Sequence, residues 1–242
     1  MQLTIVTPTY NEAENLPDMV SALFALPIEG LCILVVDDNS PDGTGEIAEK
    51  LAAEHAGRMS VIHRAAKLGL GSAYTTGFRQ ALGEGAQAIG QMDVDFSHPP
   101  EKLPIMLETL QSCDVVLGSR YVSGGSVDVQ WPLWRKGLSA FGNFYARTIL
   151  GLPVHDATGG FRIWRRETLL GIPLDRARTN GYAFQVELTY MAHLLGYHMI
   201  EVPIYFAERR RGISKMSFRI QREAAIRVWQ MLLEYRDLRP KL

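Results

Sequence analysis

The stretch AQAIGQMDVDFSHPP, residues 86–100, decides the fold class. Its first half is a short apolar run. Its second half places Asp93 and Asp95 on either side of Val94 and continues into Ser97 and two prolines. An apolar run that ends in turn residues is typical of a buried strand, and Pro99 or Pro100 suits the first turn of a helix. We therefore predict a strand that ends beside two aspartates and is followed by a helix.

The same unit recurs on both sides of this stretch. Runs rich in Val, Ile and Leu predict further strands at 3–8, 31–38, 59–64 and 113–119. Helical patterns lie between them at 11–26, 43–56, 69–85 and 100–112. This alternation favours βαβ units and a mostly parallel sheet flanked by helices. The predicted fold class is α/β, with one domain over residues 1–242.

The pattern changes after residue 119. Residues 120–137 read as a long loop with Gly and Trp, which is typical of a lid or a binding loop. A helical pattern follows at 134–150, where Trp134, Leu138, Phe141 and Tyr145 have helical spacing.

Composition excludes several classes of protein. The 242 residues are 47% hydrophobic and 21% charged, with a net charge of −1, as in an ordinary soluble chain that binds no nucleic acid. Cys32 and Cys113 lie in or beside apolar runs and read as buried thiols. The histidines lack the spacing of a zinc motif. The N-terminus does not resemble a signal peptide, and no run is long enough for a transmembrane segment, so we expect a cytoplasmic protein.

Polar clusters follow three of the predicted strands, at 7–12, 35–44 and 91–100. Each cluster alone could be a turn with helix caps, since Asp, Asn, Ser, Pro and Gly are the usual turn residues. The carboxyl ends of parallel strands, however, meet at one edge of a sheet, where ligands bind. Together the three clusters predict a site for a polar ligand.

Asp93 and Asp95 give this site its chemistry. Two residues apart in a strand, they would project to the same side and repel each other. A divalent cation removes that repulsion, and carboxylate oxygens suit Mg²⁺ or Mn²⁺, which also bind substrate phosphates. We therefore predict a metal-bound diphosphate here, although Asp95 and Ser97 could equally be helix caps. GLGSAY has Tyr74 where a dinucleotide motif needs Gly or Ala, and no GxxxxGK[ST] loop is present.

Basic side chains could bind a second anionic group. Arg120 follows the strand at 113–119, and Arg135 and Ser139 share a helix face. Arg209 and Lys215 flank a Gly-containing turn. Any one of these charges alone is more typical of a solvated surface.

With these residues identified, the chain resembles family-two glycosyltransferases of the GT-A fold, and within them the polyprenol monophosphomannose (dolichol-phosphate mannose) synthases. The matching stretches run in family order from Pro8 to Ser217: PTYNEAENL, VVDDNSPDGT, KLGLGSAY, MDVDFSHPP, GSRYVSGG, DATGGFR, GYAFQVE and RRRGISKMS. The resemblance implies a Rossmann-like nucleotide-sugar-binding half at 1–118 and an acceptor-binding half at 119–217. It also implies a C-terminal amphipathic helix at 218–242.

The resemblance also implies a role for individual residues. The nucleotide site would be lined by Pro8, Tyr10, Glu12, Val35 and Asp37. The diphosphate and metal would be held by Asp93, Val94 and Asp95, with Ser97 as a further metal-side ligand. The catalytic residues, which would also contact donor phosphate, would be Asp95, Arg120, Arg209 and Lys215. The acceptor phosphate would be bound by Arg120, Arg135 and Ser139. This chain departs from the family with Val94 in place of Ala and Gly159 in place of Ser.

The implied reaction is the inverting transfer of mannose from GDP-mannose to a polyprenyl phosphate, with Mg²⁺ or Mn²⁺. Transfer of another hexose, such as glucose from a UDP-sugar, is the alternative within this class. A non-catalytic nucleotide-sugar-binding subunit of a membrane complex is a second alternative. A sugar-nucleotidyltransferase is disfavoured, because TPTYNEAENLP lacks a Gly-rich basic signature.

A lipid acceptor implies a membrane surface as a partner, so we expect a peripheral protein on the cytoplasmic face. One candidate contact is the C-terminal helix, which carries an apolar stripe that could lie in the interface or pack on the chain's own core: Ile220, Ala224, Val228, Met231, Leu232 and Tyr235. The loop with Trp131 and Trp134 is a second candidate. A small membrane-protein partner is a third option.

Overall fold

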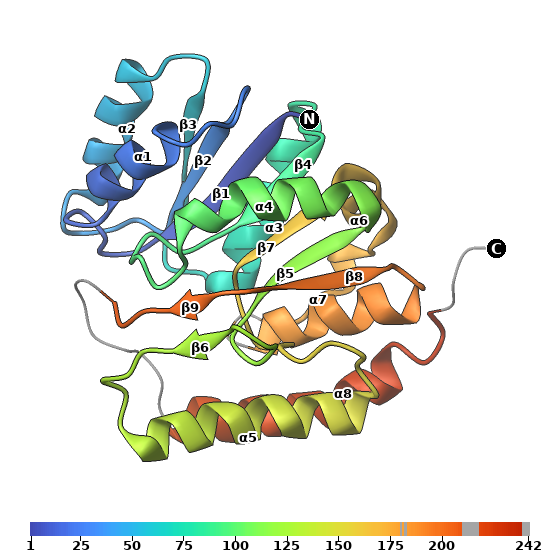
Figure 1. Cartoon of the computed structure of the whole chain (residues 1–242). Coiled ribbons are helices and arrows are strands. Elements are labelled where there is room, and N and C mark those ends of the chain that lie inside the picture. The colour runs from blue at the N-terminus through green and yellow to red at the C-terminus, as the bar shows by residue number, and fades with distance from the viewer. Residues whose placement is uncertain (180, 182, 210–217, 239–242) are drawn as a thin grey trace.

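The computed structural model describes residues 1–179, 181, 183–209 and 218–238, and for 218–223 it describes the backbone alone. Seven strands form one sheet in the order β3-β2-β1-β4-β7-β5-β8 (Figure 1). These strands are β1 (Leu3–Thr9), β2 (Cys32–Asp37), β3 (Met59–His63), β4 (Ala88–Gln91), β5 (Val115–Ser119), β7 (Arg162–Arg165) and β8 (Met199–Pro203). Five of them, β1 to β5, confirm the five strands predicted from the sequence.

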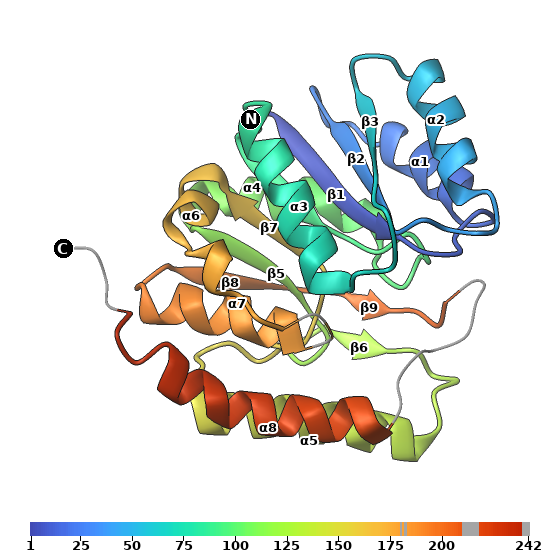
Figure 2. The ribbon, with the colours of Figure 1, turned by 180° about the vertical axis from the view of Figure 1, so that it is seen from behind.

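Helices cover both faces of this sheet (Figures 1 and 2). One face carries α1 (Leu16–Phe24), α2 (Thr44–Glu54) and α4 (Leu103–Thr109). The other carries α3 (Leu70–Gly83), α6 (Arg166–Gly171) and α7 (Ala183–Leu194). Short 3₁₀ turns lie at Pro100–Lys102, Leu110–Ser112 and Leu174–Arg176. Pro100 therefore opens the helical segment after β4, as predicted.

The sheet is parallel except at β7, which pairs antiparallel with both β4 and β5. Because helices cover both faces, every residue of β4 and β5 is buried. This double coverage explains why the strands read as near-continuous apolar runs rather than as alternating patterns. The prediction of an α/β fold with a mostly parallel sheet is confirmed.

The strand order creates a crevice at one edge of the sheet. From β1 the chain proceeds outward to β2 and β3, and then returns to form β4 on the opposite side of β1. Ligands of open α/β sheets bind at such a reversal, beyond the carboxyl ends of the strands. Here the segments that follow β1 and β4 carry the clusters at 7–12 and 91–100, so two of the predicted polar clusters become neighbours.

The region after residue 119 holds more regular structure than the sequence indicated. β6 (Ser126–Val127) pairs with β9 (Tyr205–Phe206), and α5 (Leu133–Leu150) begins inside the predicted loop. α8 (Phe218–Glu234) lies against α5 at the lower edge of Figures 1 and 2. Val228 and Met231 of α8 are buried, as is Tyr235 just beyond its end, which confirms that this part of the predicted stripe packs on the protein's own core. The side chain of Ile220 lies outside the described residues. Within the described residues, no helix has the length and apolar character needed to span a bilayer.

Gly77 allows α3 to lie close to the sheet. A Cβ at this position would collide with Cγ1 of Val6 and approach Cγ2 of Val36 to 3.1 Å. We expect Gly77→Ala to lower the free energy of unfolding by about 1–3 kcal/mol, because the packed strands leave no room for a methyl group. Gly83→Ala in the same helix is the control, because its Cβ would meet open space. Urea denaturation measures both, and equal stabilities of the two variants would contradict this account.

Candidate active site

A cavity of about 370 Å³ opens where the carboxyl ends of β1 and β4 meet the amino end of α3. Its wall combines segments that are far apart in the sequence, from residue 8 to residue 227. Of the predicted site residues, it includes Pro8, Tyr10, Glu12, Asp93, Val94, Asp95 and Arg209. The structure thus gathers most of the predicted nucleotide and diphosphate residues around one space.

Asp93 and Asp95 reach this cavity in a way the sequence did not indicate. The prediction that both lie in a strand and project to one side of it is wrong, because β4 ends at Gln91. The two aspartates lie in the irregular loop after the strand, where Phe96 has a φ of 62°. Positive φ is uncommon for a non-glycine residue, and here it turns the chain sharply before Pro100. Both aspartates nevertheless line the cavity.

Asp95 is almost fully buried and has a partner at each oxygen. Its Oδ1 accepts hydrogen bonds from the backbone N–H of Ser97 at 3.0 Å and from Ser97 Oγ at 2.6 Å. Its Oδ2 lies 3.0 Å from Nε of Arg209. Ser97, predicted as a metal-side ligand, therefore orients Asp95 here, and Arg209 compensates its charge.

Asp93 is held by hydrogen bonds with Tyr74 and His98. Its Oδ1 accepts a hydrogen bond of 3.1 Å from the hydroxyl of Tyr74 in α3. Its backbone N–H donates to Nδ1 of His98 at 3.0 Å. Burial lowers the pKa of His98, which keeps the imidazole neutral with Nδ1 free of a proton to accept this bond. Tyr74 occupies the position where a dinucleotide motif has a small residue. Its hydroxyl supports Asp93, which together with Asp95 we call the acid pair.

Sequence reasoning missed two basic residues of the cavity, Lys67 and Arg227. Nζ of Lys67 lies 3.8 Å from the ring centroid of Tyr10, a cation–π distance. Arg227 of α8 pairs with the buried Glu187 at 3.3 Å and with Glu234 at 3.2 Å. The sequence did offer a signal for both residues. Lys67 belongs to the quoted motif KLGLGSAY, and Glu187, the partner of Arg227, belongs to the quoted motif GYAFQVE.

Two predicted nucleotide residues lie in β2 beside the cavity rather than in its wall. The side chain of Val35 is fully buried in the apolar core. Asp37 is buried too, and it accepts hydrogen bonds from the hydroxyls of Thr9 at 2.9 Å and Ser40 at 2.6 Å. Asp37 therefore joins the end of β1 to the segment that follows β2.

Arg120, predicted to contact phosphate, is engaged in a buried ion pair. Its Nε and one terminal nitrogen donate to the two oxygens of Asp156, both at 2.7 Å, and that same nitrogen also donates to Thr158. The Arg120 side chain is 8% exposed and that of Asp156 is 0% exposed. Burial alone would raise the pKa of Asp156, but the Arg120 guanidinium holds it below its ordinary value.

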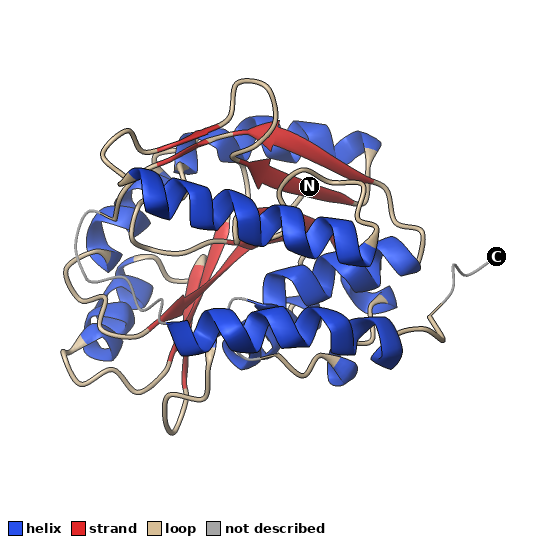
Figure 3. Cartoon of the chain, turned by 90° about the horizontal axis from the view of Figure 1, so that it is seen from below, coloured by secondary structure: helices blue, strands red, loops and turns tan. Residues whose placement is uncertain are grey.

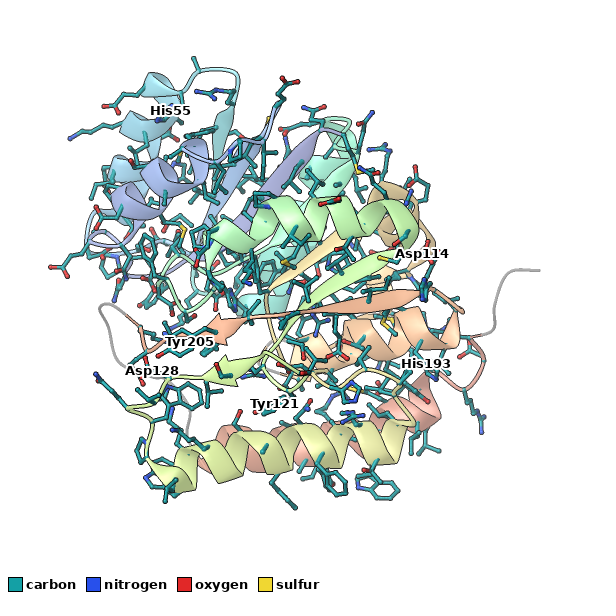
Figure 4. The ribbon with its side chains drawn as sticks, viewed as in Figure 1. His55, Asp114, Tyr121, Asp128, His193 and Tyr205 are labelled. Carbon is teal, nitrogen blue, oxygen red and sulfur yellow. The ribbon has the colours of Figure 1, made fainter. Side chains whose placement is uncertain are left out.

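Arg135 and Ser139 lie near Arg120 in a cluster of aromatic rings. Tyr121 lies between the β6–β9 pair and α5 (Figure 4), and its hydroxyl is 2.8 Å from Oγ of Ser139. The Arg120 guanidinium lies over the rings of Tyr121 and Phe206 at 5.2 and 5.3 Å. Thus the structure brings the predicted acceptor-phosphate residues into one region, outside the wall of the cavity.

Trp131 belongs to the same cluster. Its ring packs edge-on against Phe206 at 5.7 Å and beneath the Arg135 guanidinium at 3.8 Å, while Arg135 pairs with Glu208 at 2.5 Å. Trp131 is therefore buried, and the interpretation of this residue as a membrane contact is wrong. Only Trp134 of that loop prediction is exposed.

His98 links the aromatic cluster to the acid pair. Its ring lies 5.6 Å from that of Phe206, while its Nδ1 supports Asp93. The cavity with the two acids and the cluster with Arg120, Arg135 and Ser139 are therefore adjacent parts of one site. Lys215, the remaining predicted residue, lies outside the described residues.

The acid pair fits a hard divalent cation. No group of three or more His, Cys, Asp or Glu side chains suited to a metal occurs in the described part of the chain. Magnesium characteristically takes one or two carboxylates from the protein and completes its shell with water and substrate phosphates. Two carboxylates in the wall of an open cavity match that need.

The chain is similar in sequence to a known protein family and to two curated relatives. Residues 4–170 match the sequence profile of Glycosyl transferase family 2. The chain is 45% identical, over all of its length and 99% of the relative's, to the undecaprenyl-phosphate mannosyltransferase of Micrococcus luteus. It is 46% identical to the polyprenol monophosphomannose synthase of Mycolicibacterium smegmatis, over 93% of this chain and 84% of that protein.

Two solved structures share the fold at low sequence identity. A mannosyltransferase of Pyrobaculum calidifontis, in complex with GDP-Man and Mn²⁺, superposes with a TM-score of 0.63 at 18% identity, covering 98% of this chain and 67% of that one. Glucosyl-3-phosphoglycerate synthase of Mycobacterium tuberculosis, in complex with Mn²⁺, UDP and glucosyl-3-phosphoglycerate, superposes with a TM-score of 0.63 at 19% identity, covering 96% of this chain and 78% of that one.

Proposed function

The chain belongs to glycosyl transferase family 2, and on this basis we propose that it transfers mannose from GDP-mannose to a polyprenyl phosphate. The reaction we propose inverts the anomeric carbon and uses Mg²⁺ or Mn²⁺. The observation that carries the proposal is the cavity that is lined by Asp93 and Asp95 together with Tyr10, Glu12, Lys67, Arg209 and Arg227.

The names of the two relatives support the acceptor and the sugar. One is a mannosyltransferase acting on undecaprenyl phosphate, and the other makes polyprenol monophosphomannose. The donor and the metal are supported by the structural neighbour in complex with GDP-Man and Mn²⁺. This chain's own residues also support a metal, independently of those names, because the carboxylates of Asp93 and Asp95 suit a divalent cation.

Asp93 and Asp95 would hold the metal ion, which when bound neutralises negative charge on the departing diphosphate. Tyr74 and Ser97 hold these two carboxylates in place through their hydroxyl groups. Pro8, Tyr10 and Glu12 would bind the nucleotide. Lys67, which lies over the ring of Tyr10 in the cavity wall, would stabilise the phosphates.

The acceptor needs little activation. A phosphate monoester has a second pKa of about 6, so its oxygen is already anionic near neutral pH and no general base is required. We propose that Arg209 and the region of Arg120, Arg135 and Ser139 align this phosphate for attack on the face of the sugar opposite the diphosphate. Such positioning by fixed charges accounts for inversion in a single displacement.

Since the acceptor is a lipid, we place the protein at the cytoplasmic face of a membrane as a peripheral protein. A small membrane-protein partner could complete its attachment. The division into a nucleotide-sugar half, an acceptor half and a C-terminal helix remains part of this proposal.

The proposal is tested by incubating purified protein with labelled GDP-mannose, a polyprenyl phosphate in detergent, and Mg²⁺ or Mn²⁺, with and without EDTA. We expect label in the organic phase that disappears with EDTA. Transfer from a UDP-sugar but not from GDP-mannose would replace the donor and keep the reaction class. Binding of GDP-mannose without transfer to any lipid phosphate would favour a non-catalytic subunit.

Tyr74→Phe tests the support beneath the acid pair. Removing the hydroxyl deprives Asp93 of a hydrogen-bond donor, and loss of such support for a metal ligand typically costs 10- to 100-fold in affinity. We therefore expect Mn²⁺ affinity, measured by electron paramagnetic resonance, to fall by about tenfold or more. Tyr205→Phe, an exposed tyrosine away from the cavity, is the control. Equal affinities of the two variants would remove Tyr74 from this role.

A further inference from the structure

The loop between β4 and the following 3₁₀ turn carries both members of the acid pair. It spans residues 92–99 and is one of the irregular segments drawn in tan in Figure 3. Between described residues, the hydrogen bonds recorded within this loop end on side-chain atoms. Oδ1 of Asp95 accepts from Ser97, and Nδ1 of His98 accepts from the backbone N–H of Asp93. No regular element fixes the two carboxylates, so these side chains determine where they lie.

The hydrogen bond between Asp93 and His98 closes the loop on itself. Its donor and acceptor are five residues apart in the sequence and 3.0 Å apart in space. A backbone N–H can only donate, so Nδ1 must be the ring nitrogen that carries no proton. The closed segment includes Phe96, whose φ of 62° is rarely adopted by a bulky residue and persists only where the surroundings hold it. Nδ1 of His98 is one of the groups that hold it.

The imidazole of His98 is itself held firmly by residues outside the loop. It is 2% exposed and stacks on Phe161, with ring centroids 5.3 Å and planes 12° apart. Phe206 contacts it edge-on at 5.6 Å. A Cβ added at Gly160 would lie 3.3 Å from its Cε1, so there is little room between that backbone and the ring. Because close-packed groups resist displacement, these three residues fix the position of Nδ1.

His98 is not placed to take part in the chemistry directly. It does not belong to the wall of the cavity that the described residues form, and its Nδ1 is occupied by the Asp93 N–H. Any influence of His98 on the reaction must therefore pass through the loop. On its other side the ring borders the predicted acceptor region, because Phe206 also lies against the Arg120 guanidinium at 5.3 Å.

We propose that His98 is a positioning residue for the acid pair, and that the loop requires from it one hydrogen-bond acceptor at the place of Nδ1. The packed ring presents this atom, the hydrogen bond fixes the backbone of Asp93, and the carboxylate of Asp93 then lines the cavity together with that of Asp95. The inference rests on the proposed function, which assigns a metal ion to this pair. Groups that orient metal ligands typically contribute 10- to 100-fold to metal affinity.

Three substitutions of His98 separate the acceptor from the ring. His98→Asn attaches an oxygen to Cγ, where the imidazole has Nδ1, so it keeps an acceptor near the same place without the ring. His98→Gln carries the same amide one bond farther from the backbone and serves as its matched control. His98→Phe keeps an aromatic ring that can stack on Phe161, but it offers no acceptor.

Hydrogen–deuterium exchange of the full chain measures the loop without metal or substrate. The readout is the peptide that covers residues 92–99, analysed by mass spectrometry. We expect His98→Asn to exchange as slowly as the wild type. His98→Gln and His98→Phe should exchange roughly tenfold faster, because the Asp93 amide has lost its acceptor.

Mn²⁺ binding, measured by electron paramagnetic resonance, should follow the same order. We expect a loss of about tenfold or more for His98→Gln and His98→Phe, and an affinity close to that of the wild type for His98→Asn. His198→Phe, an exposed histidine outside the cavity wall, should change neither readout. Thermal unfolding shows that each variant is folded. Because His98→Phe retains the ring, its loss of affinity in a folded protein tests the acceptor even where His98→Asn is unstable.

Other patterns would overturn the inference. If the ring served only for packing, His98→Phe would match the wild type and His98→Asn would be the poorest variant. If His98 transferred a proton, His98→Asn would be as inactive in mannose transfer as His98→Phe, although its loop exchanged slowly.

The proposed function fails in a different way. A wild type that neither binds Mn²⁺ nor transfers mannose, in which loop exchange still follows the acceptor, would reject the proposed function and leave the role of His98 in the loop standing. Mannose transfer by the wild type, with equal exchange and equal Mn²⁺ affinity in all three variants, would do the reverse.

Discussion

Asp95→Asn is expected to lower kcat/KM for metal-dependent mannose transfer by about 10³-fold, the scale seen when a key electrostatic group is removed from an active site. The substitution keeps the size of the side chain and an oxygen for the two hydrogen bonds from Ser97. It removes the negative charge that faces the cavity and pairs with Arg209. The effect should therefore appear in metal binding and turnover, which are measured by Mn²⁺ titration and initial rates.

Asp175→Asn provides the comparison for Asp95→Asn. Asp175 has a side chain that is 90% exposed, and it lies outside the cavity wall, so its replacement should leave the rate unchanged. Thermal unfolding of both variants separates loss of folding from loss of chemistry. If Asp95→Asn bound Mn²⁺ and turned over as the wild type does, the acid pair would not be the metal site.

The sequence predicted those parts of the fold that depend on local pattern. β1 to β5 were visible because strands buried on both faces are continuous apolar runs, such as LCILVVDD. β7 was not predicted. It has only four residues, it follows an irregular segment, and it enters antiparallel between β4 and β5. No local periodicity encodes which strands a short segment will separate.

At the site, the residue types were easier to predict than their partners. Asp93 and Asp95 both line the cavity, although β4 ends at Gln91 and they reach it from a loop rather than from the strand. Arg120 was chosen for its charge and its place after a strand. Its partner Asp156 comes from a different segment, 36 residues along the chain, and only the tertiary fold shows that this guanidinium is enclosed.

The exposure of the two tryptophans also depends on the tertiary fold. Trp131 and Trp134 are three residues apart and read alike in the sequence, yet one is buried against Phe206 and the other is 69% exposed. Trp131 precedes α5, which begins at Leu133, whereas Trp134 lies in the first turn of that helix on its exposed side. Lys67 and Arg227 were missed because a lone basic residue in a loop or helix is normally a solvated charge.

Asp156→Asn is expected to lower the free energy of unfolding by about 3–5 kcal/mol, because it leaves the buried Arg120 without a carboxylate. Asp156 also accepts hydrogen bonds from the backbone N–H groups of Arg120 and Gly159, so its replacement disturbs the loop that precedes β7. Urea denaturation near neutral pH measures the change. The control is Asp237→Asn, which breaks an exposed, solvent-screened pair with Arg176 and should leave the stability nearly unchanged.

The cost of Asp156→Asn should also depend on pH. Because the pKa of Asp156 lies below its ordinary value of 3.8 in the folded chain, the unfolded chain binds more protons as the pH falls through that value. The stability contributed by the pair is therefore fully present above about pH 4 and decreases below it. The wild type and Asp156→Asn should converge in stability on acidification, whereas the wild type and Asp237→Asn should stay close near neutral pH. A small, pH-independent difference for Asp156→Asn would show that Arg120 and Asp156 do not form a buried ion pair.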